Sequence, residues 1–79
     1  MNIKPHLLRI LRNMSGEPLS QPAIVDSVRL SHPSMPEGDI VSELQALEGG
    51  GYVAGTRNAI LNTTLWVLTS KGALAVSQL

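Results

Sequence analysis

The stretch SMPEGDIVSELQALEGGGYVAGT, residues 34–56, predicts the start of a helix, its end and the strand that follows it. Ser34 and Glu37 have the S-x-x-E spacing of a capping box, in which each side chain binds a free N–H group at the start of a helix. Pro36 lies between them and fits the first helical turn, where its missing N–H is harmless. We therefore expect a helix to begin at Ser34.

The same stretch contains an apolar stripe followed by a run of glycines. Ile40, Leu44 and Leu47 recur at i, i+4 and i+7, so they share one helical face that is expected to pack on a core. Residues 49–51 are all glycine, which can adopt positive φ and end the helix with a sharp turn. Glycine-rich loops that bind phosphate follow a strand and open a helix, whereas these follow a helix. The pattern favours a structural turn, with a strand beginning at Tyr52.

Length and composition limit the classes of protein. The chain has 79 residues, which predicts a single domain over residues 1–79 with one small core. A hydrophobic content of 43% with 15% charged residues indicates a folded chain, and the absence of cysteine excludes disulfides and thiolate zinc sites. The sequence lacks an apolar run of about 20 residues, so we expect no membrane partner and a cytoplasmic location. The formal net charge of zero provides no compositional argument for nucleic-acid binding.

Two further helices are expected before residue 34. Residues 3–14 have apolar side chains at helical spacing, and Arg9 and Arg12, three residues apart, share one side of this helix. A second helix is expected from Ser20 or Gln21 to about residue 30, with Pro22 in its first turn. The side chains expected to face inward are Ile3, Leu7, Ile10, Leu11 and Met14 in the first helix, and Ile24, Val25 and Val28 in the second.

The second half of the chain predicts a β-hairpin and a last helix. Residues 52–56 and 64–69 are rich in β-branched and aromatic side chains and flank a polar loop, and residues 19–20 are an extended segment that could pair with this hairpin. Trp66 lies in register with Leu68, which favours a core position over a platform for nucleobases. Thr69 or Ser70 is expected to cap a helix over residues 71–79, with Leu74, Ala75 and Val76 packing inward.

Two segments, LQALEGGGYVAG and LWVLTSKGALA, resemble motifs of winged helix-turn-helix domains. The first is similar to the junction between recognition helix and wing, and the second to the last wing strand and the helix that follows it. The resemblance covers nearly the whole chain and implies an α+β, mostly α fold, with residues 34–49 as recognition helix and residues 52–69 as wing. Such domains occur mostly in transcriptional regulators, commonly dimers, although the fold also serves in protein binding.

The side chains only partly fit DNA recognition. A helical wheel places Gly38, Asp39, Ser42, Gln45 and Ala46 outward, and only Gln45 is a good base reader. Four of the six acidic residues and none of the basic ones lie in this helix, which opposes contact with phosphates. We nevertheless expect double-stranded DNA as the first partner of a transcriptional regulator acting as a dimer. The candidate DNA-binding residues are Arg29, Ser34, Ser42, Gln45, Arg57, Asn58 and Asn62.

The same charges support an alternative, a protein-interaction module without significant DNA binding. Asp39 and Glu43 could meet a basic partner, and Arg9 and Arg12 an acidic one. A homodimer could form through residues 3–11 and 74–79, although core packing explains the same apolar residues.

Catalytic, metal and cofactor sites are not expected. His6 and His32 have neither cysteine partners nor the spacing of a histidine pair on one helix. Serine residues are plentiful, but none lies in a Gly-x-Ser-x-Gly sequence. The chain is therefore expected to act by binding and not as an enzyme.

Overall fold

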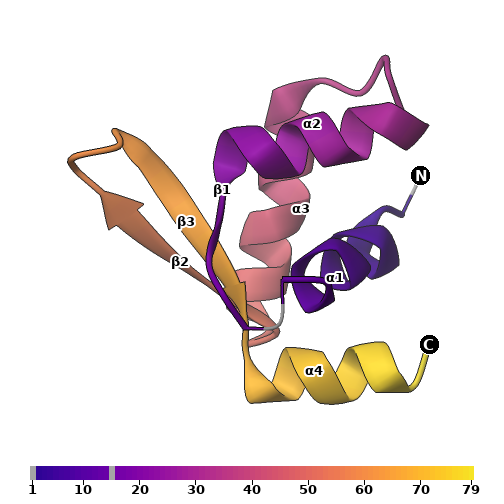
Figure 1. Cartoon of the computed structure of the whole chain (residues 1–79). Coiled ribbons are helices and arrows are strands. Elements are labelled where there is room, and N and C mark those ends of the chain that lie inside the picture. Colours follow the sequence, from indigo (N-terminus) through magenta and orange to yellow (C-terminus); the bar gives the residue numbers. More distant parts are fainter. Residues whose placement is uncertain (1, 15) are drawn as a thin grey trace.

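The computed structural model describes residues 2–14 and 16–79. Its elements follow the expected order: α1 (Lys4–Arg12), β1 (Leu19–Ser20), α2 (Gln21–Ser31), α3 (Glu37–Gly49), β2 (Val53–Asn58), β3 (Thr63–Leu68) and α4 (Ser70–Ser77). The β2–β3 hairpin projects away from the helices, whereas α1 and the end of α4 lie on the side opposite its tip (Figure 1). No helix in the described residues is long and apolar enough to cross a membrane.

One hydrophobic core joins the helices to the base of the hairpin. The apolar stripe of α3 is buried as expected, and so is the inward face of α2. Trp66 is buried as well, which confirms that it belongs to the core. The core consists of Ile3, Leu7, Leu8, Leu11, Ile24, Val25, Val28, Ile40, Leu44, Leu47, Val53, Trp66 and Val76.

A three-stranded antiparallel sheet has the order β1-β3-β2. Leu19 pairs with Trp66, so the short extended segment joins the hairpin as expected. Gly55 lies opposite Trp66 on the other side, and a Cβ atom there would be 2.8 Å from the indole ring. The strands extend further toward the tip than expected, so Arg57 belongs to β2 and only residues 59–62 form the turn.

The expected capping box at the start of α3 is wrong. The N-cap residue is Pro36, which has extended backbone angles, and no side chain caps the helix. The carbonyl of Pro36 accepts the first helical hydrogen bonds, from the N–H groups of Asp39 and Ile40. Because Pro36 is the N-cap, Ser34 lies two residues before the capping position. The helix begins at Glu37 instead of Ser34.

The glycine stop at the end of α3 forms a Schellman motif. Tyr52 N–H donates to the Leu47 carbonyl at 2.9 Å, and Gly51 N–H donates to the Glu48 carbonyl at 3.0 Å. Gly51 has a φ of +83°, the left-handed geometry that this motif requires. The expected left-handed cap is confirmed, and it turns the chain directly into β2.

The start of α4 binds the carbonyl groups of this turn, in a set of contacts that we call the clasp and define by Thr69, Lys71 and Gly72. The hydroxyl oxygen of Thr69 lies 2.6 and 3.0 Å from the carbonyl oxygens of Gly51 and Tyr52, which share its single donor hydrogen, and it accepts from Gly72 N–H. Lys71 Nζ donates to the Gly50 carbonyl at 2.7 Å. A Cβ atom on Gly72 would be 2.0 Å from the Tyr52 carbonyl oxygen, so only glycine permits this approach.

The clasp also explains why the expected inward position of Leu74 is wrong. Gly72 and Val76 are buried and lie one turn apart on the inner face of α4. Leu74 lies two residues after Gly72, about 200° around the helix, and is 65% exposed. Thr69 caps the helix by accepting from Gly72 N–H, as one of the two expected caps. The helix covers Ser70–Ser77, and α1 is likewise shorter than the expected residues 3–14.

Candidate nucleic-acid interface

The outer face of α3 is open to solvent. All five side chains expected to point outward are exposed: Gly38, Asp39, Ser42, Gln45 and Ala46. Three of them are small, so another molecule could approach the helix closely along this face. Ser42 and Gln45 are the groups on it that can hydrogen-bond to base edges.

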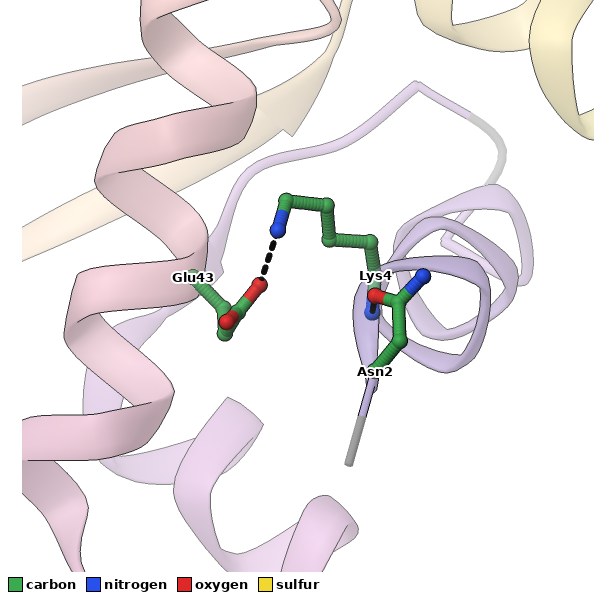
Figure 2. Close-up of polar contacts among 3 residues, drawn as sticks. All are labelled: Asn2, Lys4 and Glu43. Atoms are coloured by element: carbon green, nitrogen blue, oxygen red, sulfur yellow. Dashed lines mark hydrogen bonds and ion pairs between the residues drawn. The ribbon is translucent and has the colours of Figure 1, made fainter.

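Three of the four carboxylates of α3 bind neighbouring elements. Glu43 forms an ion pair with Lys4 of α1 at 2.5 Å, and Figure 2 shows the lysine extending across from α1 to α3. Glu37 accepts from the Gln21 amide at the start of α2 at 3.3 Å, and Glu48 accepts from the backbone N–H of Gly55 in β2 at 3.1 Å. These carboxylates connect α3 to α1, α2 and β2.

Asp39 is the remaining carboxylate of α3. Its side chain is exposed, and within residues 2–14 and 16–79 it forms no hydrogen bond or ion pair. The acidic character of the outer face is therefore concentrated at Asp39, near the start of the helix. Glu37 and Glu48 keep their charges, so the helix as a whole still repels phosphates.

We define the wing as β2, β3 and the turn at residues 59–62. Its three polar candidates, Arg57, Asn58 and Asn62, lie close together. Arg57 Nη2 donates to Asn62 Oδ1 at 2.6 Å, across the base of the turn. Asn58 Oδ1 accepts from Leu61 N–H at 2.9 Å, and Asn62 has a φ of +52°. Asparagine tolerates this left-handed geometry better than most residues. The three candidates hold the turn in one conformation.

Two other DNA candidates lie around the connection between α2 and α3. Arg29 is exposed, and its Nε donates to the Met35 carbonyl at 3.2 Å. Ser34 is exposed in the connection itself. The structure thus gives Arg29 a local role in holding the α2–α3 connection, while the rest of its guanidinium group can still meet a phosphate.

The two arginines proposed for a protein partner lie elsewhere. Arg9 and Arg12 are both exposed in the last turns of α1, where cations interact favourably with the helix dipole. Glu43, which was proposed together with Asp39 for a basic partner, binds Lys4 and is less available than expected. The structure therefore separates the protein-binding candidates, with Asp39 on α3 and the arginines on α1.

A notch of about 510 Å³ lies between the wing and the starts of α2 and α3. It brings together Arg57, Glu37 and Gln21, with Thr63 and Thr64 along one wall. Its charged groups have opposite signs, so the notch has no strong preference for an anion or a cation.

His6 of α1 contacts His32, the residue that ends α2. Their ring centroids are 5.8 Å apart and the rings meet edge to face. Among the described residues, no group of three or more His, Cys, Asp or Glu side chains is placed to hold a metal ion. The contact between the two rings is one of packing between helices.

Sequence reasoning missed the polar links between elements. Lys4 and Glu43 are 39 residues apart and share no motif, so no local pattern could have paired them. It also gave no role to the tip of the wing, where Ile60 is 95% exposed and Leu61 is 60% exposed. A signal was present there, because two large apolar residues replace the polar residues that turns prefer.

Comparison with known proteins identifies the fold. No protein-family model matches the chain, and no curated protein matches it. Among solved structures, the crystal structure of the adhesin competence repressor (AdcR) from Streptococcus pyogenes matches with a TM-score of 0.77 and 16% sequence identity. The match covers 99% of this chain and 52% of that one, so the chain spans about half the length of that protein. At this identity the likeness shows the fold alone, and it confirms the expected winged helix-turn-helix fold, α+β and mostly α.

Proposed function

We propose that this chain is a DNA-binding winged-helix protein that acts in the cytoplasm as a transcriptional regulator. The observation that carries the proposal is that Ser42 and Gln45 are exposed on the outer face of α3, while Glu37, Glu43 and Glu48 each bind another element. The solved structure that shares the fold is described as a repressor. The shared fold supports a similar role for this chain.

The charges predict weak binding by one subunit. Arg57 lies in the wing and Arg29 lies beside the α2–α3 connection. Lys4 pairs with Glu43 and Lys71 binds the Gly50 carbonyl, so few cations remain to neutralise phosphates. A dimer on two half-sites would raise the affinity, and Leu74 and Leu79 are 65% and 57% exposed on and just after α4. Residues 3–11 are a poorer interface than expected, because Ile3, Leu7 and Leu11 are buried in the subunit's own core.

The test is a mobility shift with duplexes selected from a random-sequence library, at about 50 mM salt because phosphate contacts weaken as salt rises. Replacing Gln45 by alanine should relax specificity, with a loss of about 10-fold on the selected site, since it removes a base contact. Arg57→Ala should weaken binding and lower the salt slope by about 1, because it removes one cation. Leu30→Ser, at an 88% exposed position on α2, is the matched control. Selection of no duplex at micromolar protein contradicts the proposal.

The alternative is a protein-interaction module, favoured by the free carboxylate of Asp39 and by the exposed Arg9 and Arg12. A partner bound through these groups should be lost with Asp39→Asn or with the double variant Arg9→Gln, Arg12→Gln, and kept with Leu30→Ser. Affinity purification from the source cell followed by measurement with the purified partner tests this. A partner insensitive to both variants contradicts the alternative.

A further inference from the structure

The turn of the wing combines an apolar tip with a rim of hydrogen-bond donors. Ile60 is 95% exposed at the tip, and Leu61 beside it is 60% exposed. Turns ordinarily carry glycine, asparagine, aspartate or serine, so an isoleucine at this position gains nothing for the fold. Single exposed apolar residues are common, but Ile60 and Leu61 are adjacent at the tip, and only another molecule can bury both side chains.

The rim of this tip contains hydrogen-bond donors. The Oδ1 atoms of Asn58 and Asn62 both accept hydrogen bonds within the hairpin, from Leu61 N–H and from Arg57. Their amide NH₂ groups remain as donors, together with the other N–H groups of the Arg57 guanidinium. The rim thus offers donors around an apolar centre.

The minor groove of A·T pairs has the opposite chemistry. It displays only the acceptors adenine N3 and thymine O2, whereas a G·C pair adds the donor N2 amine of guanine. All six acidic residues of the chain lie within residues 17–48, so residues 49–79 contain only the charges of Arg57 and Lys71. The wing itself therefore contains no carboxylate, and the two that lie beside it, Glu37 in the notch and Glu48 at Gly55, each accept a hydrogen bond.

We propose that Ile60 is an apolar wedge that enters a base step of an A·T-rich minor groove, with Arg57, Asn58 and Asn62 as the donors around it. The inference rests on the DNA-binding function proposed above. Side chains inserted in this way unstack a step and kink the duplex. Pyrimidine–purine steps such as TA unstack most readily, so the wedge favours them. The hydrogen bonds of Asn58 and Asn62 hold the turn in one conformation, so little further ordering is needed when it inserts.

The first experiment compares three versions of the selected duplex at the wing position, with A·T pairs, G·C pairs or inosine·C pairs. Inosine lacks the guanine N2 amine, so inosine·C pairs have the minor groove of A·T and nearly the major groove of G·C. The A·T and inosine·C duplexes should bind about 10-fold more tightly than the G·C duplex, because only the G·C groove contains that donor. Equal affinity for all three overturns the proposal.

The second experiment measures DNA bending by energy transfer between dyes at the two ends of the A·T duplex. Ile60→Ser should reduce the bend and weaken binding about 10-fold, since the apolar insertion is lost. Leu30→Ser, also highly exposed, should leave both unchanged. Asn62→Asp keeps an acceptor for Arg57 but removes the donors, so it should lower the ratio of A·T to G·C affinity.

The outcomes separate the two proposals. If the wild-type protein binds DNA and Ile60→Ser changes neither the bend nor the affinity, the wedge is wrong and the proposed function stands. Wild-type protein that binds no duplex overturns both. Because Ile60 is 95% exposed, its replacement should not affect folding, and an unchanged thermal unfolding curve checks this.

Discussion

The third helix and the wing use their polar side chains in opposite ways. The carboxylates of α3 reach outward to α1, α2 and β2, so its orientation is set by several parts of the chain. The polar groups of the wing turn bind each other within residues 57–62. Contacts with other elements fix the orientation of the helix, whereas contacts within the turn fix its conformation.

The two regions are joined at the clasp, and Gly72→Ala should have the largest effect on both. A Cβ atom would lie 2.0 Å from the Tyr52 carbonyl oxygen and 2.7 Å from Leu68 Cδ1, and the backbone atom cannot move away cheaply. We expect the free energy of unfolding to fall by about 3 kcal/mol in urea denaturation. Gly38→Ala, where nothing lies within 4 Å, is the matched control. Equal stability of the two variants would show that the clasp does not hold the regions together.

The next largest effect is expected at the turn between α3 and β2. Gly51 has a φ of +83°, and an alanine in this left-handed geometry should lower the free energy of unfolding by about 1–2 kcal/mol. Gly49→Ala is the control, because Gly49 is the last helical residue and an added Cβ atom there meets no other atom within 4 Å. Calorimetric melting of the two variants should show a loss only for Gly51→Ala.

A smaller effect on stability should show whether the backbone conformation of Asn62 or its hydrogen bond with Arg57 stabilises the wing turn. Asn62→Gly keeps the left-handed φ of +52° and removes the acceptor of Arg57, whereas Asn62→Ala also adds strain. Alanine should cost about 1 kcal/mol and glycine only a few tenths, since the hydrogen bond is exposed. Urea denaturation of both variants measures the difference. If glycine costs as much as alanine, the hydrogen bond and not the backbone geometry stabilises the turn.

The smallest effect is expected at the ion pair of α3. Lys4 and Glu43 remain 40% and 28% exposed, so water and salt screen their attraction. Glu43→Gln should lower the free energy of unfolding by about 0.5 kcal/mol or less, and 1 M salt should remove most of the difference. Glu43→Gln should also strengthen any DNA binding slightly, because the helix loses one negative charge. A loss of stability that persists in high salt would indicate packing of the side chain as its main role.

Local patterns predicted the elements and their buried faces, whereas long-range contacts decided the details. The spacing of Ile40, Leu44 and Leu47 was sufficient to place the core side of α3, because helical periodicity is a local property. The orientation of Leu74 depends on Gly72 meeting Tyr52, which lies 20 residues earlier in the chain. Sequence periodicity cannot predict that contact, and it cannot predict which groups Glu43 and Glu48 bind.

The extended Pro36 accounts for the error at Ser34. The S-x-x-E pattern was present, but Pro36, with its extended backbone, occupies the N-cap position and the helix begins at Glu37. Among the candidate site residues, the grouping of Arg57, Asn58 and Asn62 followed from their positions on one hairpin. Their mutual hydrogen bonds and the exposed Ile60 required the folded turn to be seen.

The clasp also sets an order of events during synthesis of the chain. Its hydrogen bonds join residues 50–52 to residues 69 and 71, across 17 to 21 positions of sequence. The carbonyls of the α3–β2 turn therefore remain solvated while the ribosome makes β2 and β3. At about 5–20 residues per second this interval lasts on the order of one to a few seconds. A chain that ends before Lys71 lacks both the lysine bond to the Gly50 carbonyl and the capping bond from Gly72 to Thr69, so the clasp is incomplete until α4 is made.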